Sequence, residues 1–114
     1  MTIGLCKILM KQIRLKQKEL ECIINAFHHF FPAQDHLWLF GSRVNSHSKG
    51  GDIDLYIETD LTDAKEIVDK KMALVNELYR QLGEQKIDVV INMLNSETIL
   101  PIYQVAKKEG VSLA

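Results

Sequence analysis

The chain has 114 residues, of which 46% are hydrophobic and 25% are charged, and its formal net charge is −1. This length suits one hydrophobic core and leaves little for a second module, so we expect a single domain over residues 1–114. No segment approaches the ~18 unbroken apolar residues of a membrane helix, and the near-neutral charge disfavours strong non-specific binding of nucleic acid. Basic residues interrupt any signal-peptide core near the N-terminus, so a cytoplasmic location is expected.

Residues 1–13 show no clear pattern, and we treat them as an N-terminal extension of undecided structure. Apolar side chains then recur at helical spacing and predict a helix over residues 17–30 that stops before Pro32. A short apolar run predicts a strand over residues 37–40.

A second strand is predicted over residues 53–58, after a loop rich in Ser, Asn, Gly and Lys. Alternation gives this strand one apolar face, made by Ile53, Leu55 and Ile57. The opposite face carries Asp52, Asp54 and Tyr56, and Tyr56 is a candidate to line a pocket.

A long helix is predicted over residues 62–82, and Gly83 ends it. Capping side chains are expected from Thr59, Asp60 and Thr62. The expected buried stripe of this helix consists of Ala64, Ile67, Val68, Met72, Val75, Leu78, Tyr79 and Leu82.

The last third of the chain predicts a strand over residues 86–92 and a helix over residues 100–109. In the strand, Asp88 and Val90 face away from the apolar side. The helix closes at Gly110, and a short apolar tail follows. This order of elements indicates a small mixed β-sheet flanked by helices, in the α+β or α/β class.

Three strand carboxylates are candidates for catalysis and metal binding. Asp52 and Asp54 project from one face of one strand, ~6–7 Å apart at their roots, which suits hard cations. If the strand of Asp88 pairs beside them, three carboxylates converge. Such a cluster can bind two Mg²⁺ ions ~3.5–4 Å apart, as in phosphoryl or nucleotidyl transfer.

The turn after the first strand is a candidate phosphate site. Gly41 lets backbone N–H groups approach a phosphate closely, and the Ser42 hydroxyl can donate a further hydrogen bond. Arg43 and Lys49 are candidates for charge-assisted contacts to the same polyphosphate. The sequence fits equally well with either residue being solvated on the loop surface.

The combined motif is Gly41-Ser42, nine intervening residues, Asp52-x-Asp54 and the distal Asp88. It resembles the DNA polymerase β nucleotidyltransferase superfamily, and most of all its smallest branch, the minimal nucleotidyltransferases. The likeness runs from about Leu15 through "LWLFGSRV", "GDIDLYIE" and "KIDVVI" to "IYQVAKKEGVSL".

The resemblance implies a polymerase-β-like nucleotidyltransferase fold and a role for each motif residue. Asp52 and Asp54 would bind both metals, Asp88 would activate the acceptor hydroxyl, and Gly41-Ser42 would form the triphosphate-binding turn. Two positions depart from the family pattern, Asn45 and Gly51, where glycine and serine are expected. The second departure removes a hydroxyl next to Asp52 and bears on the rate more than on the fold.

Other classes of D-x-D protein fit less well. Haloacid dehalogenase-type phosphatases place the first Asp after an apolar strand, and D-x-D glycosyltransferases need a larger nucleotide-binding domain. Trp38 and Phe40 are expected in the core and not as a base-stacking platform. The histidines at positions 28, 29, 36 and 47 are assigned no function, and Cys6 and Cys22 are expected to be reduced thiols.

The resemblance implies Mg²⁺-dependent transfer of AMP from ATP to an acceptor hydroxyl, with release of pyrophosphate. The catalytic core uses nearly the whole chain, so the acceptor is expected on a separate molecule. Minimal nucleotidyltransferases imply a helical HEPN toxin as partner, with this chain as antitoxin. The alternatives are a subunit that neutralises its partner by binding alone, and transfer to a small molecule such as an aminoglycoside. Open edges of a short sheet also allow a homo-oligomer.

Overall fold

The elements of the fold follow the predicted order. The computed structural model describes residues 17–40, 53–83, 86–96 and 100–114, so the N-terminal extension, residues 1–13, lies outside the described residues. The helices are α2 (Gln17–Phe30), α3 (Ala64–Leu82) and α4 (Pro101–Glu109). The strands are β1 (His36–Phe40), β2 (Ile53–Thr59), β3 (Ile87–Met93) and β4 (Val111–Ser112). Each predicted boundary lies within two residues of the observed one.

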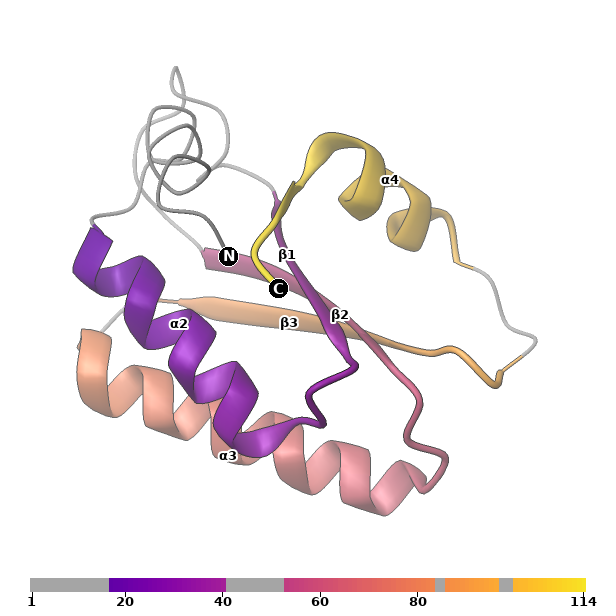
Figure 1. Cartoon of the computed structure of the whole chain (residues 1–114), viewed down its shortest axis with the longest axis horizontal. Helices are drawn as coiled ribbons and strands as arrows, with labels where there is room; N and C mark the ends of the chain where they lie inside the picture. Colours follow the sequence, from indigo (N-terminus) through magenta and orange to yellow (C-terminus); the bar gives the residue numbers. More distant parts are fainter. Residues whose placement is uncertain (1–16, 41–52, 84–85, 97–99) are drawn as a thin grey trace.

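The strands form one mixed sheet in the order β3-β2-β1-β4 (Figure 1). Strands β2 and β3 are parallel and are joined through α3, while β1 pairs antiparallel with both β2 and β4. Parallel neighbours need such a crossover, because a short turn cannot return the chain to the same end of the sheet. This arrangement confirms the predicted α+β fold with a small mixed sheet.

The expected apolar tail is instead the fourth strand. Val111 and Ser112 lie opposite Leu39 and Trp38, and the Leu37 backbone N–H donates to the Ala114 carbonyl at 3.1 Å. Leu113 is buried in the core. A two-residue strand is too short to show alternation in the sequence, so its pairing with β1 could not be read from the pattern.

Helices α2 and α3 pack on each other and cover one face of the sheet, and α4 lies against β1 and β2 on the other side (Figure 1). The core between the sheet and helices α2 and α3 is aliphatic and aromatic. Its fully buried members include Ile23, Phe27, Leu37, Leu39, Ile53, Leu55, Ile57, Leu74 and Leu78. In the described ranges, no helix has the length and apolar character to cross a membrane.

The start of α3 differs from the prediction. Its N-cap is Asp63, whose carboxylate accepts a hydrogen bond from the Lys65 N–H at 3.0 Å. The hydroxyl of Thr59 instead accepts from the Leu61 N–H within the preceding turn. An aspartate is as good a cap as threonine, so composition alone did not choose between neighbouring positions. Gly83 ends the helix as predicted, with φ +83° and its N–H bonded to Tyr79 O.

The predicted buried stripe of α3 is wrong on one side. Ile67 and Leu78 are buried, as is Leu74, which the prediction omitted, whereas Ala64 is exposed. Val68, Met72 and Tyr79 are 52%, 59% and 42% exposed, and Val75 between them is half-buried. We call these four residues the outer stripe of α3: Val68, Met72, Val75 and Tyr79. Val75 packs partly against the core. The other three residues of the outer stripe are exposed because β3 is the last strand on their side, and no described element lies beyond it.

Candidate functional site

The face of the sheet opposite α2 and α3 carries the polar side chains. On β2 these are Asp54, Tyr56 and Glu58, which alternate with the core residues. The register pairs them with Asp88, Val90 and Asn92 on β3. Residues paired in a parallel ladder point to the same face, so two rows of side chains run in parallel across this surface.

The register places the two described candidate carboxylates side by side. Asp54 and Asp88 are direct partners across the β2–β3 ladder, where strand axes lie ~4.8 Å apart. Asp54 is half-buried and Asp88 is exposed, so solvent and ligands can reach the pair. Two carboxylates this close repel each other, and a divalent cation between them would relieve that repulsion. Carboxylate oxygens are also the ligands that Mg²⁺ prefers, so this donor pair fits the expected metal.

The remaining candidate residues lie outside the described residues. These are Gly41, Ser42, Arg43, Lys49 and Asp52, all within residues 41–52. Asp52 directly precedes β2, which begins at Ile53. In the part of the chain that is described, no group of three metal-binding side chains comes together.

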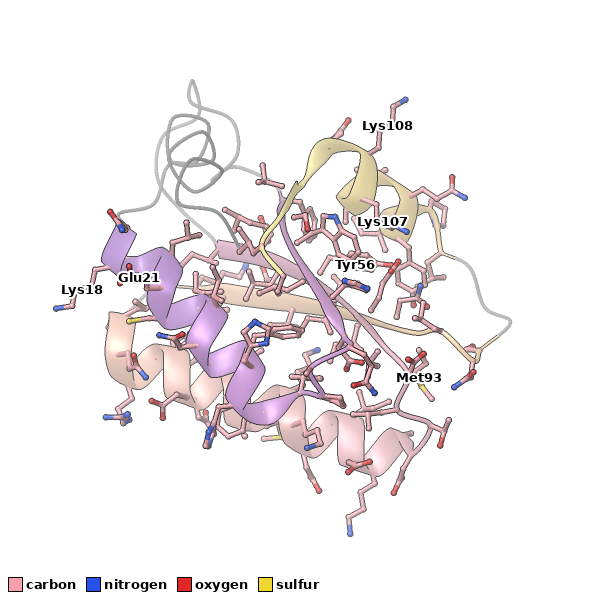
Figure 2. The ribbon with its side chains drawn as sticks, in the orientation of Figure 1. Lys18, Glu21, Tyr56, Met93, Lys107 and Lys108 are labelled. Atoms are coloured by element: carbon pink, nitrogen blue, oxygen red, sulfur yellow. The ribbon has the colours of Figure 1, made fainter. Side chains whose placement is uncertain are left out.

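A polar cluster occupies the far end of the same face and holds α4 in place. The Tyr56 hydroxyl donates to Glu58 Oε2 at 2.8 Å, and Asn92 Nδ2 donates to the Tyr56 oxygen at 3.1 Å. Lys107 Nζ of α4 lies 3.2 Å from the same Glu58 oxygen and 5.4 Å from the centre of the Trp38 ring. Figure 2 shows Lys107 directed toward Tyr56, whereas its neighbour Lys108 extends away from the sheet. We call Tyr56, Glu58, Asn92 and Lys107 the α4 clamp.

The α4 clamp corrects the expectation that Tyr56 lines a pocket. Tyr56 is fully buried, and its ring packs 5.3 Å from Trp38 and 5.7 Å from Tyr103 of α4. Burial raises the pKa of the Tyr56 phenol above its usual value, and the neighbouring Glu58 carboxylate acts in the same direction. The phenol therefore stays protonated at neutral pH and acts as a fixed hydrogen-bond donor.

The aromatic residues of β1 lie on the carboxylate face rather than in the main core. Trp38 is half-buried between Tyr56 and the Lys107 ammonium group. Phe40, also half-buried, is the register partner of Asp54. The expected core position is therefore wrong for both residues. Trp38 packs against Tyr56 and against Lys107 of α4, and not in the α2–α3 layer.

Sequence reasoning missed three members of the α4 clamp: Glu58, Asn92 and Lys107. A signal for two of them was present, since Glu58 and Asn92 lie four residues after Asp54 and Asp88 and so share their face. Lys107 gave no such signal, because a lysine on an exposed helix is usually solvated.

A groove of about 530 Å³ opens beside Asp88, between α3 and the edge of the sheet. Lys71, Met72, Val75 and Asn76 line it from α3, and residues 87–90 of β3 form its other wall. The groove joins the outer stripe of α3 to the strand that carries the candidate catalytic carboxylate.

Comparison with known proteins gives one family. Residues 21–113 match the family described as "Polymerase beta, Nucleotidyltransferase". The match begins within α2 and ends after β4, so it includes every described strand and the positions of all seven candidate residues. A search of curated proteins finds no match.

Proposed function

Because the chain belongs to the polymerase β nucleotidyltransferase family, we propose that it transfers AMP from ATP to an acceptor hydroxyl. The observation that supports this is the register of β2 and β3, which sets Asp54 beside Asp88 on a face that ligands can reach. If these acids were only solvated side chains at strand ends, nothing would require Asp54 and Asp88 to lie side by side on neighbouring strands.

In the proposed reaction, Asp52 and Asp54 would hold the metal ions, and Asp88 of β3 would complete the carboxylate set. Mg²⁺ bound there would neutralise the triphosphate and stabilise the charge that develops on the attacking and leaving oxygens. The acceptor oxygen attacks the α-phosphorus, and the bond from this phosphorus to the bridging oxygen breaks. Pyrophosphate leaves with the electron pair of that bond.

Asp88 is the proposed acceptor of the hydroxyl proton. It is the more exposed acid of the described pair, so an acceptor can reach it from the open face of the sheet. A carboxylate that takes this proton as the new bond forms contributes about 10²–10⁴-fold to a rate.

The triphosphate is proposed to bind at the turn after β1. Gly41 would permit close approach of backbone N–H groups, and Ser42 would donate from its hydroxyl. Arg43 and Lys49 would add positive charge to the same site. Phe40, the residue before Gly41, lies opposite Asp54 at the end of the sheet that carries the acids.

The proposed acceptor is a hydroxyl group on a partner protein of the helical HEPN class, with the present chain acting as antitoxin. This proposal rests on the resemblance to minimal nucleotidyltransferases. The alternative function is neutralisation of that partner by binding alone, without transfer of AMP.

The decisive experiment combines purified chain, Mg²⁺, each labelled nucleoside triphosphate and the candidate partner, followed by intact mass spectrometry of both proteins. We expect the partner to gain the mass of one AMP with ATP as donor. Asp54→Asn should abolish the transfer, whereas Asp69→Asn, which changes an exposed acid of α3, should not. Absence of labelling with every nucleotide would contradict the enzyme. Full neutralisation of the partner by Asp54→Asn would favour binding alone.

A further inference from the structure

The outer edge of β3 is open to pairing. Ile53 N–H donates to Lys86 O at 2.9 Å, and Leu94 N–H donates to Thr59 O at 2.9 Å. These two bonds show that the even-numbered residues of β3 are the ones whose backbone groups bond to β2 in the parallel ladder. The backbone N–H and C=O groups of the odd-numbered residues therefore point away from the sheet: Ile87, Val89, Ile91 and Met93.

The sequence of β3 lacks the usual protection of an edge strand. Its seven residues contain no lysine and no proline, and Asp88 is their single charge. Exposed edges are usually blocked by such residues or covered by another element. In the described part of the chain, no element covers this edge.

The apolar surface of α3 continues this open edge. The side of α3 that faces α2 is largely polar, with Glu66, Lys70 and Glu77 beside the two open pockets there. The opposite side carries the outer stripe, and Met72 and Val75 reach the groove beside β3. An open strand edge next to exposed apolar side chains is typical of an interface rather than of a free surface.

The residues of β3 are self-complementary about Val90. In an antiparallel pair of two β3 strands centred there, Ile87 lies opposite Met93 and Val89 lies opposite Ile91. Asp88 lies opposite Asn92, so a carboxylate meets an amide donor and no like charges face each other. A self-matching strand is what a two-fold axis requires, since each residue must suit its counterpart in both directions.

We propose that β3 and the outer stripe of α3 bind a second copy of this chain about a two-fold axis. The two β3 strands pair antiparallel through their odd-numbered residues, and the sheet continues from one copy into the other. Helices α3 of both copies lie on the same side of that sheet, so their outer stripes cover each other. Asn92 of the second copy then lies beside Asp88, and each candidate active site borders the neighbouring copy.

The first test is the mass in solution, measured by light scattering during gel filtration. We expect a mass twice the 13.1 kDa of the chain. Met72→Glu places like charges close together across the axis and should give the monomer mass. Met72 is 59% exposed, so this change leaves the fold of the single chain intact. The control is Val105→Glu, which makes the same change at an exposed apolar residue of α4, far from the proposed interface, and should leave the dimer mass unchanged.

A second variant tests the strand edge itself. Ile91→Pro removes an N–H that points away from β2, so the ladder within the chain keeps its bonds and the dimer should dissociate. Ser112→Pro is the matched control on β4, the opposite edge of the sheet, and should leave the mass unchanged. Circular dichroism of both variants checks that they remain folded.

Cross-linking tests the register. In the proposed pair, Val90 meets its own copy at a position without direct cross-strand bonds, where Cα atoms lie ~4.5 Å apart. This separation suits a disulfide. In a Cys6→Ser, Cys22→Ser background, Val90→Cys should form a covalent dimer on oxidation, and Ser112→Cys should not.

A monomeric wild-type chain at every concentration would overturn the proposal, as would a dimer that Met72→Glu and Ile91→Pro leave intact. Equal cross-linking of the two cysteine variants would also overturn it. If the chain is monomeric and instead binds a different protein in a manner sensitive to Met72→Glu, the surface belongs to that protein and the second copy is excluded. None of these measurements requires nucleotidyl transfer, so failure of the enzyme proposal does not affect them.

Discussion

The contact between Lys107 and Glu58 provides a sharp test of how α4 is held on the sheet. We expect Lys107→Met to destabilise the protein, because it removes the only ammonium group within 4.0 Å of the Glu58 carboxylate among the described residues. Methionine keeps an apolar stem against Trp38, so the change removes charge more than packing. Figure 2 shows why Lys108 is the matched control, since its side chain leads into solvent.

The exposure of the two side chains sets the expected magnitude. Breaking a fully buried ion pair costs ~3–5 kcal/mol, whereas exposed pairs contribute ~0–1 kcal/mol. The Glu58 side chain is 10% exposed and that of Lys107 is 50% exposed, so the pair lies between these limits. We therefore expect a loss of about 1–2 kcal/mol, which corresponds to about 4–8 °C in Tm for a chain of this length.

Urea denaturation measures this loss of unfolding free energy directly. The proteins to compare are Lys107→Met, Lys108→Met, Glu58→Gln and the double variant Lys107→Met, Glu58→Gln. Lys108→Met should change the free energy of unfolding by less than ~0.5 kcal/mol. The coupling energy between Lys107 and Glu58 should be about 1 kcal/mol. Equal effects of Lys107→Met and Lys108→Met, or a coupling energy of zero, would refute the role of the clamp in holding α4.

Three other changes test the site and its support. Asp88→Asn should lower the rate of nucleotidyl transfer by about 100-fold or more. The free energy of unfolding should change by less than ~1 kcal/mol, because the substitution also removes a like-charge contact with Asp54. Rates and melting curves of one preparation check both effects. Tyr56→Phe should cost about 1–3 kcal/mol in urea denaturation, because its two side-chain partners lose their bonds. Burial raises the pKa of the Tyr56 phenol, so the folded protein keeps a proton that the unfolded chain releases. This stabilisation is complete below about pH 10 and is lost as pH rises further. The absorbance spectrum of the phenolate, obtained by subtracting the Tyr56→Phe spectrum, should appear at higher pH in the folded protein than in the urea-unfolded chain. Gly110→Ala should cost about 1–3 kcal/mol by thermal denaturation, because a Cβ there would press on the Ala106 carbonyl at the end of α4.

Much of the fold was predictable because its elements have clear periodicity. The helix of residues 17–30 and the strands that carry Asp54 and Asp88 were predicted nearly to the residue. Their apolar faces meet one continuous core, so local pattern and final burial agree. The resemblance to nucleotidyltransferases, drawn from the same strands, is confirmed by the family match.

The errors arise where the pattern depends on distant parts of the chain. β4 exists because residues 111–112 meet the free edge of β1, and a dipeptide carries no periodic signal. The outer stripe of α3 has the apolar character of a buried face, but its exposure depends on which strand lies at the edge of the sheet. Periodicity identifies apolar surface without saying what covers it.

The candidate site was predictable in part. Alternation put Asp54 and Asp88 on known faces of their strands, and the parallel register then makes them neighbours. The contact between Glu58 and Lys107 was not predictable, because it depends on where α4 docks after a turn in the chain. The roles of Gly41, Ser42, Arg43, Lys49 and Asp52 remain predictions from the motif.

The late position of β4 has a consequence for synthesis of the chain. β1 receives its second neighbour from a strand that begins at Val111, about 70 residues later, which corresponds to about 4–14 s of translation. During this interval the edge of β1 that later pairs with β4 has no partner strand. Ribosome-associated chaperones would be needed most in that window, and variants that weaken the closing strand should lower the yield of protein in cells more than they lower its equilibrium stability.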